Sequence, residues 1–481
     1  MSGPRAHHPS VLVLLSDDQG PWALGCAGNE EIITPTLDGL AAEGTRLENF
    51  FCVSPVCSPA RASLLSGTIP SVHGVHDYLA GQDSGPGAPP YLADVPLVTE
   101  SFAEAGYRVG LSGKWHLGTS DVPGPGFTHW FALEGGGSPY HDATFFRVSE
   151  KTGLAERVHV TDYVTDVIAD DAIEFVRTQP DDRPFFLQVG FTAPHKPFAG
   201  QHPARFEDLY ADCAFATCPQ EPLHPWTPLV DGVPIGGERD TRAALVGYFA
   251  AVTAMDEAIG RILGALAESG RAEDTVVVFM SDNGFSCGHH GIWGKGNGTY
   301  PQNMYDSSVK VPAIFHLPGR VERGQVLTEL LSGYDVAATL LELAGLPHSP
   351  FESGPGRSFA QLLTGGAPAE PDREVVVHDE YGPVRMIRTD TWKYVHRHPS
   401  GPHELYDLAA DPGERSNLVD DPVRAATVAQ LRDRLARWFG RHVRGAADGA
   451  GLPVVGAGQL RPLADDPQDA FAPPGWDSIA G

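Results

Sequence analysis

The chain has 481 residues, of which 42% are hydrophobic and 20% are charged, a globular composition with room for one large domain and a smaller one. Its 61 acidic and 34 basic residues give a formal net charge of −27. Such an acidic chain is a poor partner for nucleic acids and anionic membrane surfaces, and an anionic ligand would need local cations to bind against the overall field.

The start of the chain lacks the layout of a signal peptide. The apolar run Val11–Leu15 has only five residues, and no small-residue cleavage site follows it. No apolar run approaches the roughly 18 residues that a membrane span requires. The six cysteines show no strong metal-binding spacing, and the spacing of Cys213 and Cys218 is a weak signal. We therefore expect a soluble, cytoplasmic protein without a membrane partner.

Strand and helix patterns alternate along residues 10–281. Continuous apolar runs at 11–15 and 275–280 indicate strands that are buried on both faces. The other predicted elements are helices at 34–44, 95–106, 164–179 and 241–270, and strands at 108–112 and within 183–195. This alternation predicts an α/β fold with a large, mostly parallel, doubly wound sheet and helices on both faces.

From about Glu374 the pattern changes to short strand candidates at close spacing. They lie at 374–380, 384–390, 392–398 and 404–408, and a helix pattern follows at 423–443. This order predicts a small antiparallel sheet on which the helix packs. The tail from Gly445 is rich in Gly, Pro and Asp and is expected to be extended. We divide the chain into a large α/β domain, residues 1–370, and a C-terminal subdomain, residues 371–481.

Polar side chains directly follow the two most apolar strands. Asp17 and Asp18 follow the first strand, and Asp282 and Asn283 follow the second. Ligands of open α/β sheets bind outside the carboxyl ends of the strands, so these side chains converge if the two strands are neighbours. Converging carboxylates repel one another unless a hard cation neutralises them, and all-oxygen ligation suits Ca²⁺ or Mg²⁺. For either pair alone, helix capping or turn formation is the alternative explanation.

Basic side chains gather near other predicted strand ends, between glycines at 291–298, and in the stretch around Cys57. They are Lys114 and His116, His195 and Lys196, Lys295, and Arg61. A single Lys or His is more often an ordinary surface or core residue. Four separate cationic segments favour an anion that is held between a metal ion and a ring of basic groups.

One stretch, PVCSPARASLLSG at 55–67, resembles the Cys-x-Pro-x-Arg signature of type I sulfatases, with Cys57 two residues before Pro59 and four before Arg61. The signature more often has Thr where this chain has Ser66. Seven further stretches between about residues 10 and 420 resemble blocks of this family in the expected order. They are SDDQG, TPTLDGLAAEG, GKWHLG, TAPHKPF, SDNG with GHHGIWGKG, SSVKVPAIFHLPG and ELYDLAADPGERSNL.

The chain is thus identified as a member of this family within the alkaline phosphatase superfamily. The family's fold, a large α/β domain with a small C-terminal antiparallel sheet, agrees with the plan predicted above, and it makes residues 1–370 the catalytic domain. In this family a dedicated enzyme oxidises the signature cysteine to formylglycine. The resemblance therefore implies that Cys57 is not a thiol in the mature protein.

The resemblance also implies a mechanism and a cofactor. One hydroxyl of the hydrated formylglycine would attack sulfur, and the second would release the sulfate as the aldehyde reforms. The cofactor would be Ca²⁺, with Mg²⁺ as the alternative. The implied ligands are Asp17, Asp18, Asp282, Asn283 and the formylglycine made from Cys57.

Roles for the basic residues follow from the same resemblance. Arg61 would hold the nucleophile, and Lys114 and Lys295 would neutralise the sulfate oxygens. His116 would assist deprotonation of the diol, and His195 would protonate the leaving oxygen, alone or together with Lys114. Neighbouring residues expected in the substrate pocket are Lys196, His289 and His290, with ordinary loop positions as the alternative.

The predicted activity is hydrolysis of a sulfate ester of a carbohydrate or another small organic molecule, with a formylglycine-generating enzyme as the partner during maturation. One alternative is a formylglycine-dependent phosphodiester or phosphonate monoester hydrolase, although GKWHLG and IWGKG look more like sulfatase blocks. The other is an anion-binding protein in which Cys57 stays unmodified. Specificity is expected to depend on the loop at 134–146 and the insert at 200–242, whose sequences identify no substrate.

Overall fold

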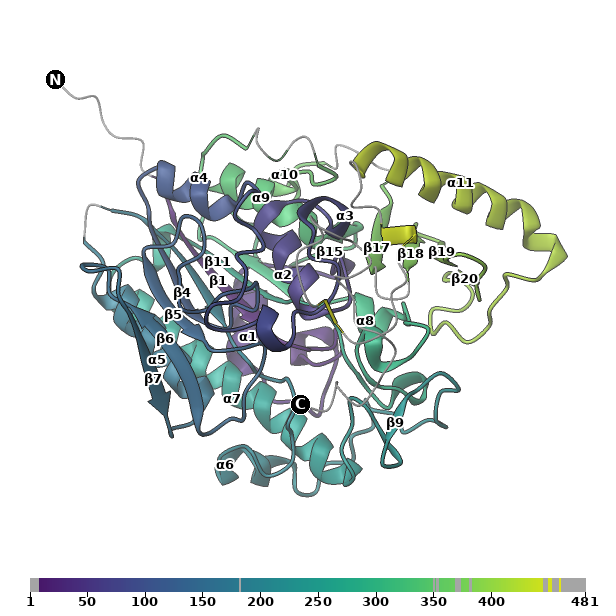
Figure 1. The fold of residues 1–481 in the computed structure, drawn as a ribbon, viewed down its shortest axis with the longest axis horizontal. Helices are drawn as coiled ribbons and strands as arrows, with labels where there is room; N and C mark the ends of the chain where they lie inside the picture. The colour runs from purple at the N-terminus through teal and green to yellow at the C-terminus, as the bar shows by residue number, and fades with distance from the viewer. Residues whose placement is uncertain are drawn as a thin grey trace.

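The structure is a computed structural model that describes residues 8–180, 183–348, 351, 354–367, 373–379, 383–443, 449–451 and 458–459. Its centre is a ten-stranded sheet with the order β15-β2-β14-β11-β1-β8-β4-β5-β6-β7 (Figure 1). The five neighbouring central strands are parallel; four of them were predicted from the sequence, and the fifth, β5, was not. They are β11 (Thr275–Ser281), β1 (Ser10–Ser16), β8 (Phe185–Gly190), β4 (Arg108–Gly113) and β5 (His129–Leu133).

Helices cover both faces of this sheet, because side chains on β1 alternate between two apolar layers. Val11, Val13 and Leu15 pack on one side with α2 (Cys57–Ser66), α4 (Val98–Glu104), α9 (Val336–Leu343) and α10 (Ala360–Leu363). Leu12 and Leu14 pack on the other side with α1 (Pro35–Glu43), α5 (Val164–Arg177), α6 (Ala204–Glu207) and α7 (Thr241–Glu268). The predicted large, mostly parallel sheet with helices on both faces is confirmed.

Both wings of the sheet contain strands that the apolar pattern did not reveal. On one side β6 (Ala143–Val148) and β7 (Ala155–Val160) add antiparallel. On the other side β14 (Ala313–His316), β2 (Thr45–Leu47) and β15 (Gln325–Leu327) complete the sheet. The prediction of a loop at 134–146 is therefore wrong for its last four residues, which lie in β6. The outermost strand, β7, is mostly exposed, and its sequence AERVHV contains no continuous apolar run that would predict a strand.

Smaller elements surround this frame. They are α3 (Pro70–His73), α8 (Asp306–Val309), and the short strands β3 (Phe50–Phe51), β9 (Leu229–Val230), β10 (Val233–Pro234), β12 (Ser286–Cys287), β13 (Trp293–Gly294) and β16 (Leu331–Ser332). Within the described chain, α7 is the one helix that is long and apolar enough to cross a membrane, by length and composition alone. It is 78% buried over its most apolar window, so it is a core helix against the large sheet.

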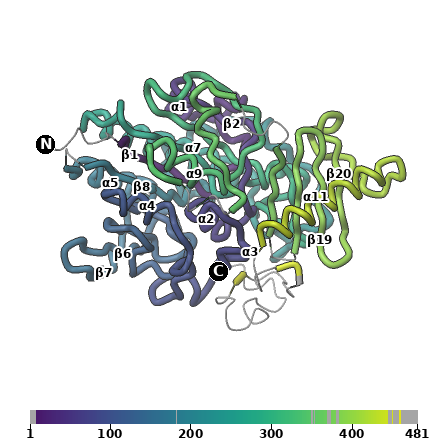
Figure 2. Tube along the Cα trace, turned by 90° about the horizontal axis from the view of Figure 1, so that it is seen from above, coloured from purple at the N-terminus to yellow at the C-terminus, as the bar shows by residue number. Residues whose placement is uncertain are grey.

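The C-terminal strands form the small antiparallel sheet that the sequence predicted. They are β17 (Val375–Asp379), β18 (Val384–Arg388), β19 (Trp392–Arg397) and β20 (Glu404–Asp407). Leu431, Leu435 and Trp438 of α11 (Ala425–His442) pack against Ile387 and Tyr394 of this sheet, and Figure 2 shows α11 lying along it. The predicted boundary between residues 370 and 371 falls outside the described residues, as does most of the predicted extended tail.

A buried ion network joins the small sheet to the large domain. The Lys393 ammonium on β19 is fully buried and lies 2.5 Å from both a carboxylate oxygen of Asp306 and one of Glu414. It also donates to the Met304 carbonyl at 2.9 Å. The backbone amide of Asp306 in turn donates to Glu414 at 2.7 Å. One cation therefore neutralises two carboxylates from segments more than a hundred residues apart.

The substitution Lys393→Met should destabilise the protein strongly. It removes the shared cation, which leaves the buried Glu414 carboxylate without its ammonium partner and leaves Asp306 with only Arg388 at 3.9 Å. Breaking a buried ion pair in this way costs about 3–5 kcal/mol. Urea unfolding followed by tryptophan fluorescence measures this loss, with the exposed Lys151→Met as the control that should change stability little. Equal midpoints for the two variants would contradict a role for Lys393 in joining the sheets.

Candidate active site

The four predicted oxygen ligands meet because β1 and β11 are parallel neighbours with Ser16 opposite Ser281. Asp17 and Asp18 leave the end of β1, and Asp282 and Asn283 leave the end of β11. The backbone amide of Asp282 donates to the Ser16 carbonyl at 3.2 Å, which ties the two turns together. All four side chains are buried. The sheet therefore places three carboxylates and one amide in a single site, which we name the carboxylate cluster (Asp17, Asp18, Asp282 and Asn283).

The turn after β1 holds Asp18 in a backbone conformation that non-glycine residues rarely adopt, with φ of 62°. Tyr248 on the core helix α7 stabilises it. The Tyr248 hydroxyl donates to the Asp18 carbonyl at 2.9 Å and accepts from the Gly20 amide at 3.0 Å. A left-handed residue persists only where its surroundings fix it, and this tyrosine supplies that restraint. Sequence reasoning missed Tyr248, because it lies inside a long apolar helix and carries no motif.

Cys57 is the first residue of α2, so it lies at the positive end of a helix that faces the carboxylate cluster. Its Sγ atom is 3.3 Å from an oxygen of Asp17, 3.9 Å from one of Asp18 and 2.6 Å from Nζ of Lys295. Burial and the Asp17 charge raise the pKa of the Cys57 thiol far above its usual range. An unmodified Cys57 is therefore a neutral thiol at physiological pH, which is a weak nucleophile.

Each carboxylate of the cluster has its own cation. Nζ of Lys114 is 2.5 Å from Asp17, and Nζ of Lys295 is 2.6 Å from Asp18. Nε of Arg61 is 2.8 Å from Asp282. These basic side chains are all buried. Lys114 follows the end of β4, Lys295 lies in a loop after β13, and Arg61 lies in α2. The structure thus brings together the three basic residues to which the resemblance assigned contacts with the nucleophile or the sulfate.

The pKa values of two carboxylates are shifted in opposite directions. Burial alone would raise the pKa of Asp17, but the basic side chains around it, Lys114 above all, hold it well below the usual range. For Asp282, burial and the neighbouring Asp17 charge outweigh the Arg61 guanidinium and raise its pKa to about 6. Negative charge is therefore crowded most severely at Asp282, where additional positive charge would be stabilising.

The cluster fits a hard divalent cation. Ligand atoms of Asp17, Asp18, Cys57 and Asp282 all lie within 4.8 Å of one another. The amide oxygen of Asn283 is buried beside them and has no hydrogen-bond partner in the described chain, while its nitrogen lies 2.8 Å from Asp18. Carboxylate and amide oxygens at this spacing are the donor set that Ca²⁺ and Mg²⁺ prefer.

Two imidazoles border the cluster in different ways. His195 is the more accessible, with a side chain 22% exposed and Nε2 3.7 Å from an Asp18 oxygen. Its Nδ1 is 2.7 Å from the Lys196 carbonyl, and its own carbonyl accepts from the hydroxyl of Tyr140. Burial lowers the pKa of His195, although Asp17 and Asp18 oppose the shift. A neutral His195 whose Nδ1 is engaged by a carbonyl would carry its proton on Nδ1 and leave Nε2 free to accept one.

His116 is buried, and its Nε2 lies 2.9 Å from the Leu79 carbonyl. Its backbone has φ of 59°. Its Nδ1 is buried and has no partner among the described residues. Burial is the main cause that lowers the pKa of His116 well below its usual range, and the Lys114 charge is the second. The Leu79 contact was not foreseen, because a backbone carbonyl leaves no sequence signal.

The three residues expected in a substrate pocket have other described partners. Lys196 is partly buried and donates to the Ile235 carbonyl at 3.2 Å. His289 lies 2.9 Å from the Thr217 carbonyl through Nε2. His290 stacks on Tyr305, with ring centroids 3.8 Å apart. All three residues thus contact the 200–242 insert, His290 through its backbone amide, which donates to Glu221 at 3.2 Å.

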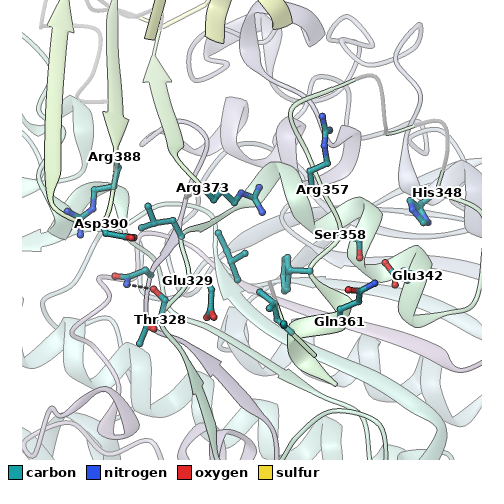
Figure 3. A pocket seen from close by; sticks show the side chains of 16 residues that line it. Thr328, Glu329, Glu342, His348, Arg357, Ser358, Gln361, Arg373, Arg388 and Asp390 are labelled. Atoms are coloured by element: carbon teal, nitrogen blue, oxygen red, sulfur yellow. Dashed lines mark hydrogen bonds between the residues drawn. The ribbon is translucent and has the colours of Figure 1, made fainter. Parts of the chain in front are cut away.

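A separate cavity of about 590 Å³ lies between α9, α10 and the end of β18 (Figure 3). None of the cluster residues lines it. Its charged lining includes Glu329, Arg373 and Arg388, so both signs are present. Arg373 already pairs with Asp335 at 2.5 Å, which ties that guanidinium to a buried carboxylate. The mixed charges therefore do not identify one class of ligand.

Comparison with protein families identifies the family to which the chain belongs. A family model described as "Sulfatase" matches residues 9–346, and one described as "N-sulphoglucosamine sulphohydrolase, C-terminal" matches residues 288–439. The choline-sulfatase of Rhizobium meliloti (strain 1021) is 30% identical over 472 residues, covering 89% of this chain and 87% of the relative. The N-acetylglucosamine-6-O-sulfatase of Bacteroides thetaiotaomicron is 25% identical over 485 residues, which cover 85% of this chain and 82% of the relative.

Solved structures share the fold over most of the chain. A protein bound to its substrate D-glucosamine-2-N,6-O-disulfate gives a TM-score of 0.77 at 23% identity and covers 90% of this chain and 98% of its own. The phosphonate monoester hydrolase of Agrobacterium radiobacter gives a TM-score of 0.66 at 23% identity, and the match covers 90% of this chain and 96% of that enzyme. At these identities the likeness shows the fold alone.

Divalent cations should stabilise the folded protein through the carboxylate cluster. Ca²⁺ at one hundred times its dissociation constant should add about 2.7 kcal/mol of stability, because it binds the folded state alone. Thermal unfolding with Ca²⁺ and with excess chelator measures this difference without any assay of activity.

The variant Asp282→Asn should lose most of the Ca²⁺-dependent shift in Tm, since it removes a charged ligand. Asp433→Asn, on the exposed side of α11, is the matched control and should keep the full shift. An undiminished shift in Asp282→Asn would place the cation elsewhere.

Proposed function

The chain belongs to the sulfatase family and is a sulfuric ester hydrolase, and from this premise we propose that it cleaves the sulfate ester of a carbohydrate or another small organic molecule. We propose further that it acts through a formylglycine made from Cys57 and a Ca²⁺ ion in the carboxylate cluster. The observation that carries this proposal is the position of Cys57 at the start of α2, within reach of Asp17, Asp18 and Lys295.

The chemistry of Cys57 itself supports the need for modification. A buried thiol whose pKa is raised is not ionised at neutral pH, so it has little reactivity toward sulfur. Hydrated formylglycine would supply an oxygen nucleophile and a second hydroxyl, and a bound divalent cation would supply positive charge for the sulfate oxygens. The same neighbours that crowd the thiol would then surround that oxygen.

The chain's own residues would perform the remaining steps. Lys114 and Lys295 would neutralise charge on the sulfate, because their ammonium groups are buried and adjacent to Asp17 and Asp18. Arg61 would hold Asp282 in place and hold the nucleophile. In a low-dielectric site such fixed cations stabilise developing negative charge more than they would in water.

Proton transfer is assigned to the two imidazoles. His195 is the accessible one, so it would face the substrate. Once Nε2 has accepted a proton, His195 would donate that proton to the leaving oxygen. His116 is buried and held by the Leu79 carbonyl, so it would accept a proton within the site. Lys196, His289 and His290 are proposed to line the substrate pocket, where the insert at 200–242 would help to set specificity.

The names of relatives support a small or sugar-linked sulfate as the substrate. One relative is a choline-sulfatase and another an N-acetylglucosamine-6-O-sulfatase, so related chains of similar length act on small esters and on sugars. The net charge of −27 points the same way, because a long polyanion would be repelled. A formylglycine-dependent phosphonate monoester or phosphodiester hydrolase is the second candidate, favoured by the shared fold of the Agrobacterium radiobacter enzyme.

The mature protein should contain formylglycine at position 57. Mass spectrometry of the tryptic peptide that contains Cys57 should show a loss of about 18 Da, since the thiol is replaced by an aldehyde. Cys57→Ala should lower kcat by several orders of magnitude while leaving Tm nearly unchanged. A free thiol in active protein from the native host would contradict the proposed nucleophile.

Sulfate esters should be cleaved in preference to phosphodiesters. The ratio of kcat/KM for p-nitrophenyl sulfate to that for a p-nitrophenyl phosphodiester should exceed about 100, because fixed cations and proton donors are matched to one transition state. The ratio is measured on protein of known formylglycine content. A ratio below one would favour the phosphodiester and phosphonate alternative.

A further inference from the structure

The described end of the chain, Gly458 and Gln459, lies against the loop that follows α3 (Pro70–His73). Figure 2 shows the yellow end of the described chain next to α3. Gln459 is fully buried and forms an isolated parallel bridge with Leu79. This contact joins residues that are 380 positions apart, so no local sequence signal foretells it.

Both the oxygen and the nitrogen of the Gln459 side-chain amide form hydrogen bonds with the loop at 74–79. Its Oε1 accepts from the His76 amide at 2.7 Å, and its Nε2 donates to the Gly74 carbonyl at 3.0 Å. Its backbone amide donates to the Tyr78 carbonyl at 3.0 Å. One residue therefore satisfies three backbone groups of a buried loop, which would otherwise be left unpaired at a cost.

The same loop touches two parts of the candidate active site. The Leu79 carbonyl is 2.9 Å from Nε2 of His116. The Leu79 amide donates to Oγ of Ser58 at 3.1 Å, and Ser58 is the residue after Cys57 at the start of α2. A shift of Leu79 would therefore move both the imidazole and the beginning of the helix that carries the nucleophile position.

We propose that Gln459 is a positioning residue for the active site: it fixes the loop at 74–79, and through Leu79 it orients His116 and the start of α2. The proposal rests on the proposed function, because it assigns Gln459 a role in the active site described above. The contact chain has two steps, from Gln459 to the loop and from the loop to Ser58 and His116. Gln459 itself touches neither of these two residues in the described contacts.

The backbone before Gln459 also fits closely against the loop. Gly458 has φ of 85°, and a Cβ at this position would lie 2.9 Å from the Tyr78 ring. A side chain there would push Gln459 away from its three partners. Gly458→Ala is therefore a second, independent way to loosen the same contact without changing Gln459 itself.

The test compares three variants of the full-length chain. Gln459→Met keeps the length of the side chain but removes its hydrogen bonds, and Gly458→Ala displaces it. Gln179→Met is the matched control: Gln179 is also buried and donates to a backbone carbonyl, that of Phe175 at 2.7 Å, but it lies after α5 on the outside of the sheet. Rates on p-nitrophenyl sulfate are normalised to the formylglycine content of each preparation.

Both tail variants should lower kcat by about tenfold to a hundredfold with KM changed less than about threefold, since a misplaced catalytic group costs rate rather than binding. Hydrogen exchange of the His76 and Leu79 amides should become about tenfold faster, because the loop loses its anchor. Gln179→Met should leave kcat and the exchange of this loop unchanged.

The exchange measurement separates failure of this inference from failure of the proposed function. Unchanged exchange at His76 and Leu79 in both tail variants would overturn the inference, whatever the activity. An unchanged kcat, or a rise in KM alone, would also overturn it, because the tail would then not orient the reacting groups. A parent chain without activity on sulfate esters would count against the proposed function, and the exchange data would still decide whether Gln459 holds the loop.

Discussion

The whole site depends on one electrostatic constraint, which is the confinement of Asp17, Asp18 and Asp282 at the ends of two adjacent parallel strands. Three carboxylates removed from water repel one another and lose their hydration. The protein compensates by burying Lys114, Lys295 and Arg61 beside them. Ligand atoms of Asp17, Asp18, Cys57 and Asp282 still lie within 4.8 Å of one another, beside the Asn283 amide oxygen, which is unpaired within the described chain, and this geometry is the physical reason for assigning a divalent cation to the cluster.

The surrounding fold serves to hold these charges in register. Parallel pairing of β1 with β11 aligns the two turns, and α7 restrains the first turn through Tyr248. Cys57 approaches from the other direction at the start of α2. Since the groups come from segments far apart in the chain, any loss of sheet register would separate the charges from their partners. Stability of the core and geometry of the site are therefore coupled in this protein.

The fold and the substrate are specified by different parts of the molecule. The fold is shared with proteins that have different substrates, among them a protein bound to its substrate D-glucosamine-2-N,6-O-disulfate and a phosphonate monoester hydrolase. A shared fold does not fix the substrate, which depends on the residues of the site. In this chain the insert at 200–242 contacts Lys196 and His289, two of the residues proposed to line the substrate pocket.

The sequence by itself determined four of the five central strands, the helices α1, α4, α5, α7 and α11 and the C-terminal sheet, because buried parallel strands are continuous apolar runs and the helices carry an apolar stripe. It did not reveal the central strand β5. It also determined the candidate residues at the strand ends, since their chemistry is visible without coordinates. Only the tertiary structure decided that β1 and β11 are neighbours, which cation faces which carboxylate, and that Tyr248, Leu79 and Gln459 support the site. These contacts depend on backbone groups and on pairs of residues hundreds of positions apart, and neither leaves a periodic or local signal in a single sequence.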